Sequence, residues 1–182
     1  SLGQGLAIAA GIALANKNMI TECESIGVDF YKVLSWHLKD YDYITDLLDK
    51  TSKHIYVSTG TSSLLDLDKF YQRFGNINRI SFIHTQLTFQ PEDTNLKSIQ
   101  TITEKYKIPV GYGNHCKNLN TIYSALSFNP SDIWFYVKGS HMENHPDEIH
   151  SVPLNEVGDF VDNLKEVNLA IGDGLKKNTN TM

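Results

Sequence analysis

Lysine, hydroxyl and histidine side chains stand at or just after the ends of short apolar segments in this sequence. They are Lys32, Ser35, Ser58, Thr59, His84, His115 and Lys138. Ammonium and hydroxyl donors beside a glycine-flanked backbone suit a phosphate or carboxylate group. Two imidazoles that face each other across a common edge suit a divalent metal ion. If the fold brings these segment ends together, the residue types predict an anion site and a metal site.

Each of these residues also has a simpler interpretation. A histidine at a strand end is commonly a surface or capping residue, and Ser58 or Thr59 can cap the helix that follows. The aliphatic stem of Lys32 can pack while its ammonium reaches water, and Cys116 suits a small packed position. A second candidate metal set is His141, His145 and His150. Pro146 interrupts any helix that would align them, so a solvated loop is the favoured interpretation there.

The elements that must position these side chains follow a period of about 25 residues. Short β-rich segments are Phe30–Leu34, His54–Ser58, Arg79–His84, Ile108–Tyr112 and Ile133–Lys138, and their starts are separated by 24, 25, 29 and 25 residues. Apolar residues at helical spacing lie between and after them, in the segments 41–48, 67–74, 96–106, 122–126 and 157–167. Strand and helix therefore alternate five times.

Such alternation is typical of a parallel sheet with helices outside it. The carboxyl ends of parallel strands meet at one edge, where the chemistry of these folds is usually found. A closed barrel needs eight units, and five are visible here. The sequence therefore predicts a partial (β/α)8 barrel with sequential parallel strands, and its open edges favour a homo-oligomer or a partner chain that covers them.

Composition narrows the class of protein further. The chain has 182 residues, 41% of them hydrophobic, and a net charge of −5. A dispersed, net negative charge argues against nucleic acid as the main partner. Two cysteines, Cys23 and Cys116, form no disulfide framework or zinc spacing, and the longest apolar run, Leu6–Ala15, is too short for a bilayer span. We expect a cytoplasmic protein without a membrane partner.

Five motifs in order resemble the N-acetylneuraminate (sialic acid) synthases and their pseudaminic and legionaminic acid relatives. They are VDFYKVLS, HIYVSTGTSSLLDLD, ISFIHT with PEDTNL, IPVGYGNH and IGDGLKKNT, and the match runs from about residue 23 to residue 177. The resemblance implies a (β/α)8 barrel that condenses phosphoenolpyruvate with the aldehyde of an N-acetylated amino sugar.

The resemblance also implies roles by position. His84 and His115 match the two histidine ligands of a divalent metal, Mn or Mg, which polarises the aldehyde. Lys32, Ser35, Ser58 and Thr59 match the residues that hold phosphoenolpyruvate. Lys32 and Lys138 are the candidate catalytic residues, since fixed positive charge stabilises the departing phosphate.

Several positions depart from the family pattern. His37 stands where an acidic residue is usual, TQLTFQP replaces a Cys-Thr-Ser and Tyr-Pro pattern, and a later Asp-His pair reads Asp147-Glu148. Of the strand-eight motif only Lys138 is kept, and units one to three are not visible. We therefore expect the chain by itself to be incomplete or inactive. A non-catalytic remnant that acts as a binding or assembly module is the alternative.

Residues 1–16, SLGQGLAIAAGIALAN, resemble a transketolase segment but lack a thiamine-binding motif. Thiamine-dependent transfer is thus a third, weaker hypothesis. The domain plan is an Ala-rich helix over residues 1–20, a partial barrel over residues 21–177 and a tail over residues 178–182.

Overall fold

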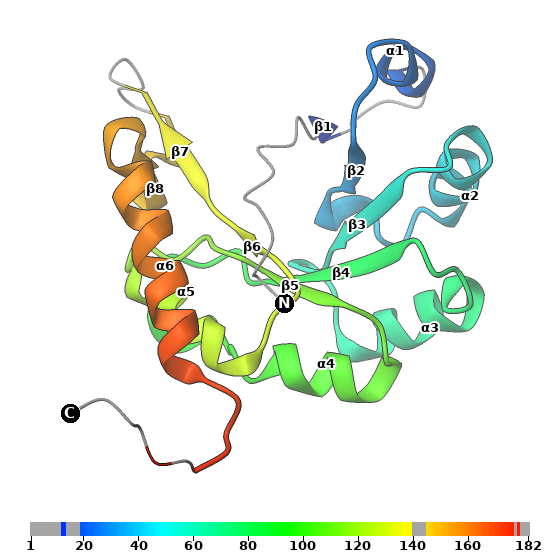
Figure 1. The fold of residues 1–182 in the computed structure, drawn as a ribbon. Helices are drawn as coiled ribbons and strands as arrows, with labels where there is room; N and C mark the ends of the chain where they lie inside the picture. The colour runs from blue at the N-terminus through cyan, green and yellow to red at the C-terminus, as the bar shows by residue number, and fades with distance from the viewer. Residues whose placement is uncertain (1–11, 14–18, 140–144, 177, 179–182) are drawn as a thin grey trace.

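A curled parallel sheet forms the centre of the molecule, with helices on its outer side (Figure 1). The computed structural model describes residues 12–13, 19–139, 145–176 and 178. The strands of the sheet are, in spatial and chain order, β1 (Ile12–Ala13), β2 (Phe30–Val33), β3 (His54–Ser58), β4 (Ile80–Thr85), β5 (Val110–Gly113) and β6 (Ile133–Trp134). Every neighbouring pair is parallel. The predicted partial barrel with sequential parallel strands is confirmed.

Two local predictions are wrong. The expected strand over residues 133–138 is broken at Phe135, whose ring packs 5.1 Å from that of Phe160. Beyond this break β7 (Tyr136–Lys138) leaves the main sheet and pairs with β8 (Ser151–Pro153). The helix expected over residues 1–20 is contradicted at Ile12–Ala13, which form a strand, whereas residues 19–20 are helical. Residues 1–11 and 14–18 lie outside the described residues, so the prediction is not tested there.

The predicted helices are confirmed with small changes in their bounds. They are α2 (Tyr41–Lys50), α3 (Leu64–Phe74), α4 (Ser98–Tyr106), α5 (Asn120–Ala125) and α6 (Val157–Ile171), preceded by the unpredicted α1 (Met19–Ser25). Ser63 caps α3 in a reciprocal capping box with Asp66. The last helix ends at Gly172, whose φ of 69° suits a residue without Cβ. Within the described residues no helix is both long and apolar enough to cross a membrane.

Alternation along each strand divides the sheet into two faces. Tyr31, Val33, Ile55 and Val57 belong to the buried core between the sheet and its helices. The residues between them, such as Lys32, point to the inner, concave face. Whether a residue is one of the inward-pointing or the outward-pointing positions of its strand therefore decides whether its side chain can reach the barrel mouth.

Aromatic side chains fill the inner face. The ring of Phe30 on β2 lies 5.2 Å from that of Tyr56 on β3 and 5.4 Å from that of Trp134 on β6. Tyr56 and Trp134 are 5.0 Å apart, edge to face. Since β2 and β6 are separated by three strands, this cluster shows how strongly the sheet curls.

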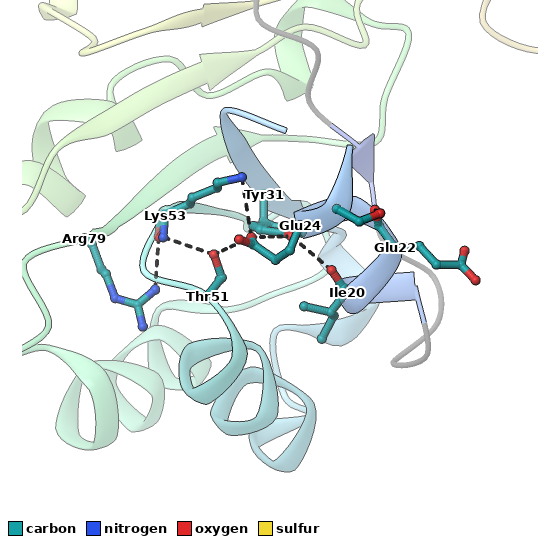
Figure 2. Close-up of polar contacts among 8 residues, drawn as sticks. Ile20, Glu22, Glu24, Tyr31, Thr51, Lys53 and Arg79 are labelled. Carbon is teal, nitrogen blue, oxygen red and sulfur yellow. Dashed lines mark hydrogen bonds and ion pairs between the residues drawn. The ribbon is translucent and has the colours of Figure 1, made fainter. Parts of the chain in front are cut away.

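A polar cluster closes the amino-terminal end of the sheet (Figure 2). Glu24 Oε1 accepts hydrogen bonds of 2.7 Å from the hydroxyls of Tyr31 and Thr51, and Lys53 Nζ lies 3.6 Å away. Arg79 donates to the carbonyl oxygen of Lys53 at 3.0 Å. These bonds join α1 to the starts of β2, β3 and β4.

Candidate functional site

A cavity of about 290 Å³ opens at the carboxyl ends of β2 to β6. Among its lining residues are Lys32, Ser58, Thr85, His115, Trp134 and Tyr136. The cavity lies at the position where the sequence predicted an active site, and it joins polar groups to an aromatic wall.

Lys32 supplies the positive charge of this cavity. It is the third residue of β2, and its ammonium lies 5.4 Å from the centre of the Trp134 ring. In the described part of the chain it forms no ion pair. Burial lowers the pKa of Lys32. An ammonium that is partly desolvated and has no carboxylate partner is suited to an anionic ligand.

Two serine hydroxyls lie beside it on adjacent segments. Ser35 follows β2, Ser58 ends β3, and their Oγ atoms are 3.0 Å apart. The backbone N–H of Gly60 donates to Ser35 Oγ at 3.0 Å. A Cβ at Gly60 would lie 2.9 Å from Ser35 Oγ, so only glycine allows this approach. Ser58 thus lines the same cavity as Lys32, and Ser35 lies within hydrogen-bonding distance of Ser58.

His115 reaches the cavity because Asn114 fixes the turn after β5. Asn114 is 1% exposed, and its Oδ1 accepts from the hydroxyls of Tyr112 and Thr121, both at 3.1 Å. Its Nδ2 donates to the carbonyl oxygen of Cys116 at 2.9 Å. This network holds Asn114 on the core side and turns His115 to the inner face. Burial, and then the charges of His150 and Lys32, lower the pKa of His115 to about 4.

The parallel pair of β7 and β8 brings two more groups to His115. The rings of His115 and His150 are 5.2 Å apart, and both contact Tyr136. Asp147 Oδ1 lies 3.4 Å from His150 Nε2. Ligand atoms of His115, Asp147 and His150 all lie within 4.8 Å of one another, so these three residues could hold a metal ion. His150 is 1% exposed, and burial lowers its pKa.

The structure does not bring His84 to this site. His84 lies two residues after Phe82 on β4, so its side chain points to the same face of the sheet, the one covered by the helices. Its Nε2 donates to the carbonyl oxygen of Thr94 at 3.0 Å, and its ring lines a second cavity, away from His115. Burial lowers its pKa as well. The expected approach of the His84 and His115 imidazoles is not found.

Thr59 and Lys138 also lie apart from Lys32. Thr59 lines the cavity that His84 lines, and its hydroxyl donates to the carbonyl oxygen of Ile83 at 3.0 Å. Lys138 is on β7, where its Nζ lies 3.7 Å from a carboxylate oxygen of Glu148. Both side chains already have partners.

Sequence reasoning missed Asp147, His150 and Tyr136 as members of the site. His150 had been considered only in a solvated loop with His141, which lies outside the described residues, and His145. The signal was the segment Ser151–Pro153 directly after His150, which forms β8 and buries the imidazole. A three-residue strand is too short to be recognised by periodicity.

A curled sheet of sequential parallel strands, with outer helices and a polar cavity at the carboxyl ends, defines a partial (β/α) barrel. The sequence matches the NeuB family over residues 12–176. The chain therefore belongs to the NeuB family.

Relatives with assigned names are distant in sequence. The N,N'-diacetyllegionaminic acid synthase of Campylobacter jejuni is 22% identical, over 84% of this chain and 47% of that protein. The pseudaminic acid synthase of the same species is 26% identical, over 79% and 43%. The chain spans about half the length of the curated relatives it matches.

Solved structures show the same fold. N-acetylneuraminic acid synthetase of Leptospira borgpetersenii superposes with a TM-score of 0.82 at 20% identity, covering 91% of this chain and 59% of that one. The spore coat polysaccharide biosynthesis protein spsE of Bacillus subtilis superposes with a TM-score of 0.79 at 14% identity, over 92% and 48%.

Proposed function

We propose that this chain carries the phosphoenolpyruvate-binding part of a nonulosonic acid synthase, which condenses phosphoenolpyruvate with the aldehyde of an N-acetylated amino sugar. The observation that carries the proposal is the cavity lined by Lys32, Ser58 and His115 at the carboxyl ends of the strands, in a chain of the NeuB family. The names of the relatives supply the class of product.

Within this proposal Lys32, Ser35 and Ser58 hold the phosphate and carboxylate groups. Lys32 has no carboxylate partner in the described part of the chain, and the two hydroxyls lie within hydrogen-bonding distance of each other. A dianionic phosphate gains a charge-assisted bond from the ammonium and hydroxyl bonds from the serines. Trp134 and Tyr136 form the apolar wall that limits water beside the enol carbon.

The proposed condensation has three steps. The enol carbon of phosphoenolpyruvate forms a bond to the aldehyde carbon, water adds at the carbon that carries the phosphate, and inorganic phosphate leaves. A divalent metal, when bound, supplies Lewis-acid polarisation of the aldehyde. Lys32 neutralises charge on the departing phosphate and keeps the reactants aligned. Thr59 and Lys138 stay secondary candidates, since both have other partners.

We also propose that the isolated chain associates with itself or with a partner chain. Among the described residues β1 and β6 each pair with one neighbour in the main sheet, which leaves a strand edge on either side of the described sheet. Sedimentation velocity at micromolar concentration checks this expectation.

The cytoplasm is the proposed location, because both cysteines are free.

Calorimetric titration of the purified chain with phosphoenolpyruvate tests the binding step. We expect binding in the wild-type chain and at least a roughly tenfold weaker affinity in Lys32→Met, which removes the charge and keeps the length. Lys165→Met, at an exposed position on α6, is the matched control and should bind as the wild type does. An absence of binding at millimolar ligand, or equal loss in both variants, would contradict the proposal.

Condensation is assayed separately, by release of phosphate with N-acetylmannosamine present and by mass spectrometry of the product. We expect background rates from this chain alone, because the described strands leave the mouth open on one side. Turnover would establish the synthase reaction and refute the expectation of an inactive half-barrel. Binding without turnover is also the result that the alternative, a non-catalytic binding module, predicts.

A further inference from the structure

We propose that His115, Asp147 and His150 form a three-ligand site for a divalent first-row transition-metal ion, in which His150, directly before β8, takes the role that the resemblance gave to His84. The inference concerns this chain's own ligand set and does not depend on the condensation reaction. It moves the metal site from the ends of β4 and β5 to the end of β5 and the segment before β8.

The spacing of the donor atoms suits one ion. Metal bonds to imidazole nitrogen and carboxylate oxygen are roughly 2.0–2.2 Å long, which puts neighbouring ligand atoms about 3–4 Å apart. The candidate atoms of the three residues all lie within 4.8 Å of one another. Small rotations about side-chain bonds bring them onto a single ion, whereas His84 is held on the other face of the sheet by Thr94.

His150 points to a ligand by a second observation. The residue is 1% exposed, and neither of its ring nitrogens has a hydrogen-bond partner among the described residues. Buried polar atoms nearly always have a hydrogen-bond partner, so two ring nitrogens without one need an explanation. Asp147 is close, at 3.4 Å from Nε2, but without hydrogen-bond geometry. A metal ion would bind one ring nitrogen of His150 together with a carboxylate oxygen of Asp147.

The donor types decide the class of ion. Two neutral imidazoles and one carboxylate are typical of zinc, iron, manganese, cobalt and nickel sites, whereas magnesium and calcium prefer oxygen ligands throughout. The family resemblance left Mn and Mg open, and this donor set favours the transition metal. Affinity should rise from manganese to cobalt to nickel.

Phe89 and Tyr136 make a clean substitution possible. The ring of His150 lies 5.7 Å from that of Phe89 and 4.8 Å, edge to face, from that of Tyr136. His150→Phe keeps a ring in this packing and removes both nitrogens. We expect the metal-free variant to unfold at or above the wild-type temperature, because it buries no unpaired nitrogen.

The experiment titrates the whole chain with Co²⁺ and follows visible absorption and heat. We expect one bound ion in the wild-type chain. Its affinity should fall by more than roughly tenfold in His150→Phe and in Asp147→Asn, since even outer-shell partners of metal ligands are worth that factor. His84→Asn keeps an N–H donor for Thr94 and should bind Co²⁺ within about twofold of wild type.

Thermal unfolding supplies the second readout. Co²⁺ should raise the unfolding temperature of the wild-type chain and of His84→Asn, whose side chain is outside the donor set. It should not raise that of His150→Phe, and Mg²⁺ should raise none of them. Loss of binding in His84→Asn with retention in His150→Phe would overturn the assignment, as would the absence of one-to-one binding in the wild-type chain. Phosphoenolpyruvate is left out, so the result is separate from the test of the proposed function.

Discussion

The two ends of the parallel sheet each carry a polar cluster, and the clusters differ in how their groups are paired. At the amino-terminal end Glu24 accepts from Tyr31 and Thr51 and lies beside Lys53 (Figure 2). At the carboxyl-terminal end both ring nitrogens of His150 lack a hydrogen-bond partner in the described part of the chain.

The difference separates a structural cluster from a binding cluster. Paired groups at the start of the strands stabilise the way α1 packs on the sheet. Unpaired buried nitrogens cost free energy in the isolated chain and become favourable only when a ligand reaches them. The same residue types thus have different roles, and hydrogen-bond accounting distinguishes them.

The largest effect is expected at the paired cluster. Glu24→Ala leaves the Thr51 hydroxyl without its acceptor and the Tyr31 hydroxyl with only the 3.4 Å contact to the carbonyl oxygen of Ile20, which should lower the free energy of unfolding by roughly 2 kcal/mol. Urea denaturation measures it. Glu22→Ala is the control, because Glu22 is exposed on the same helix and should change stability by less than about 0.5 kcal/mol. Similar values for both variants would refute a structural role for the cluster.

Asn114 tests whether the turn after β5 positions His115. Asn114→Ala removes the acceptor for Tyr112 and the donor to the carbonyl oxygen of Cys116, and should cost roughly 2 kcal/mol of unfolding free energy. Affinity for Co²⁺ should also fall, since His115 loses its orientation. Asn120→Ala, at an exposed position on α5, should leave both measurements unchanged. A destabilised variant with wild-type metal affinity would show that Asn114 does not position His115.

The pH dependence of stability checks the desolvation of His115. Its folded pKa of about 4 lies below the ordinary value of 6.5. Between these values the unfolded chain binds a proton that the folded chain does not, so the free energy of unfolding falls as the pH falls through this window. We expect a loss of roughly 1–2 kcal/mol after allowance for partial exposure. Urea titrations of metal-free His115→Asn should show a shallower loss; parallel curves would contradict the desolvation.

The smallest effect on stability is expected at Lys32. Its ammonium forms no ion pair in the described part of the chain, and a methionine can pack against Trp134 in its place. Lys32→Met should therefore change the free energy of unfolding by less than about 0.5 kcal/mol while weakening phosphoenolpyruvate binding. A loss as large as that of Glu24→Ala would place Lys32 among the structural residues.

Much of the fold was predictable because the signals are local. Apolar residues at i, i+3 and i+4 in α2 and α3, and short apolar runs between them, specify elements without reference to the rest of the chain. The break at Phe135 was not predictable, since it arises from packing against Phe160 of a distant helix. The strand at Ile12–Ala13 was missed because its two residues pair only with β2.

The candidate site likewise contains residues that the sequence predicted and residues that only the structure placed there. Lys32 and Ser58 were expected at one edge of the sheet, because the carboxyl ends of parallel strands share that edge, and both line the cavity there. His84 was placed with them, yet the structure puts its side chain on the other face of β4.

The sequence by itself therefore determined the order of strands and helices, the edge at which polar residues gather and the family to which the motifs belong. Only the tertiary structure decided which histidine lies beside His115. A shift of one residue along a strand moves a side chain to the opposite face of the sheet. The motif did not determine to which face of β4 the side chain of His84 points. His150 reaches His115 through the pairing of β7 with β8, a contact between segments that no local pattern records.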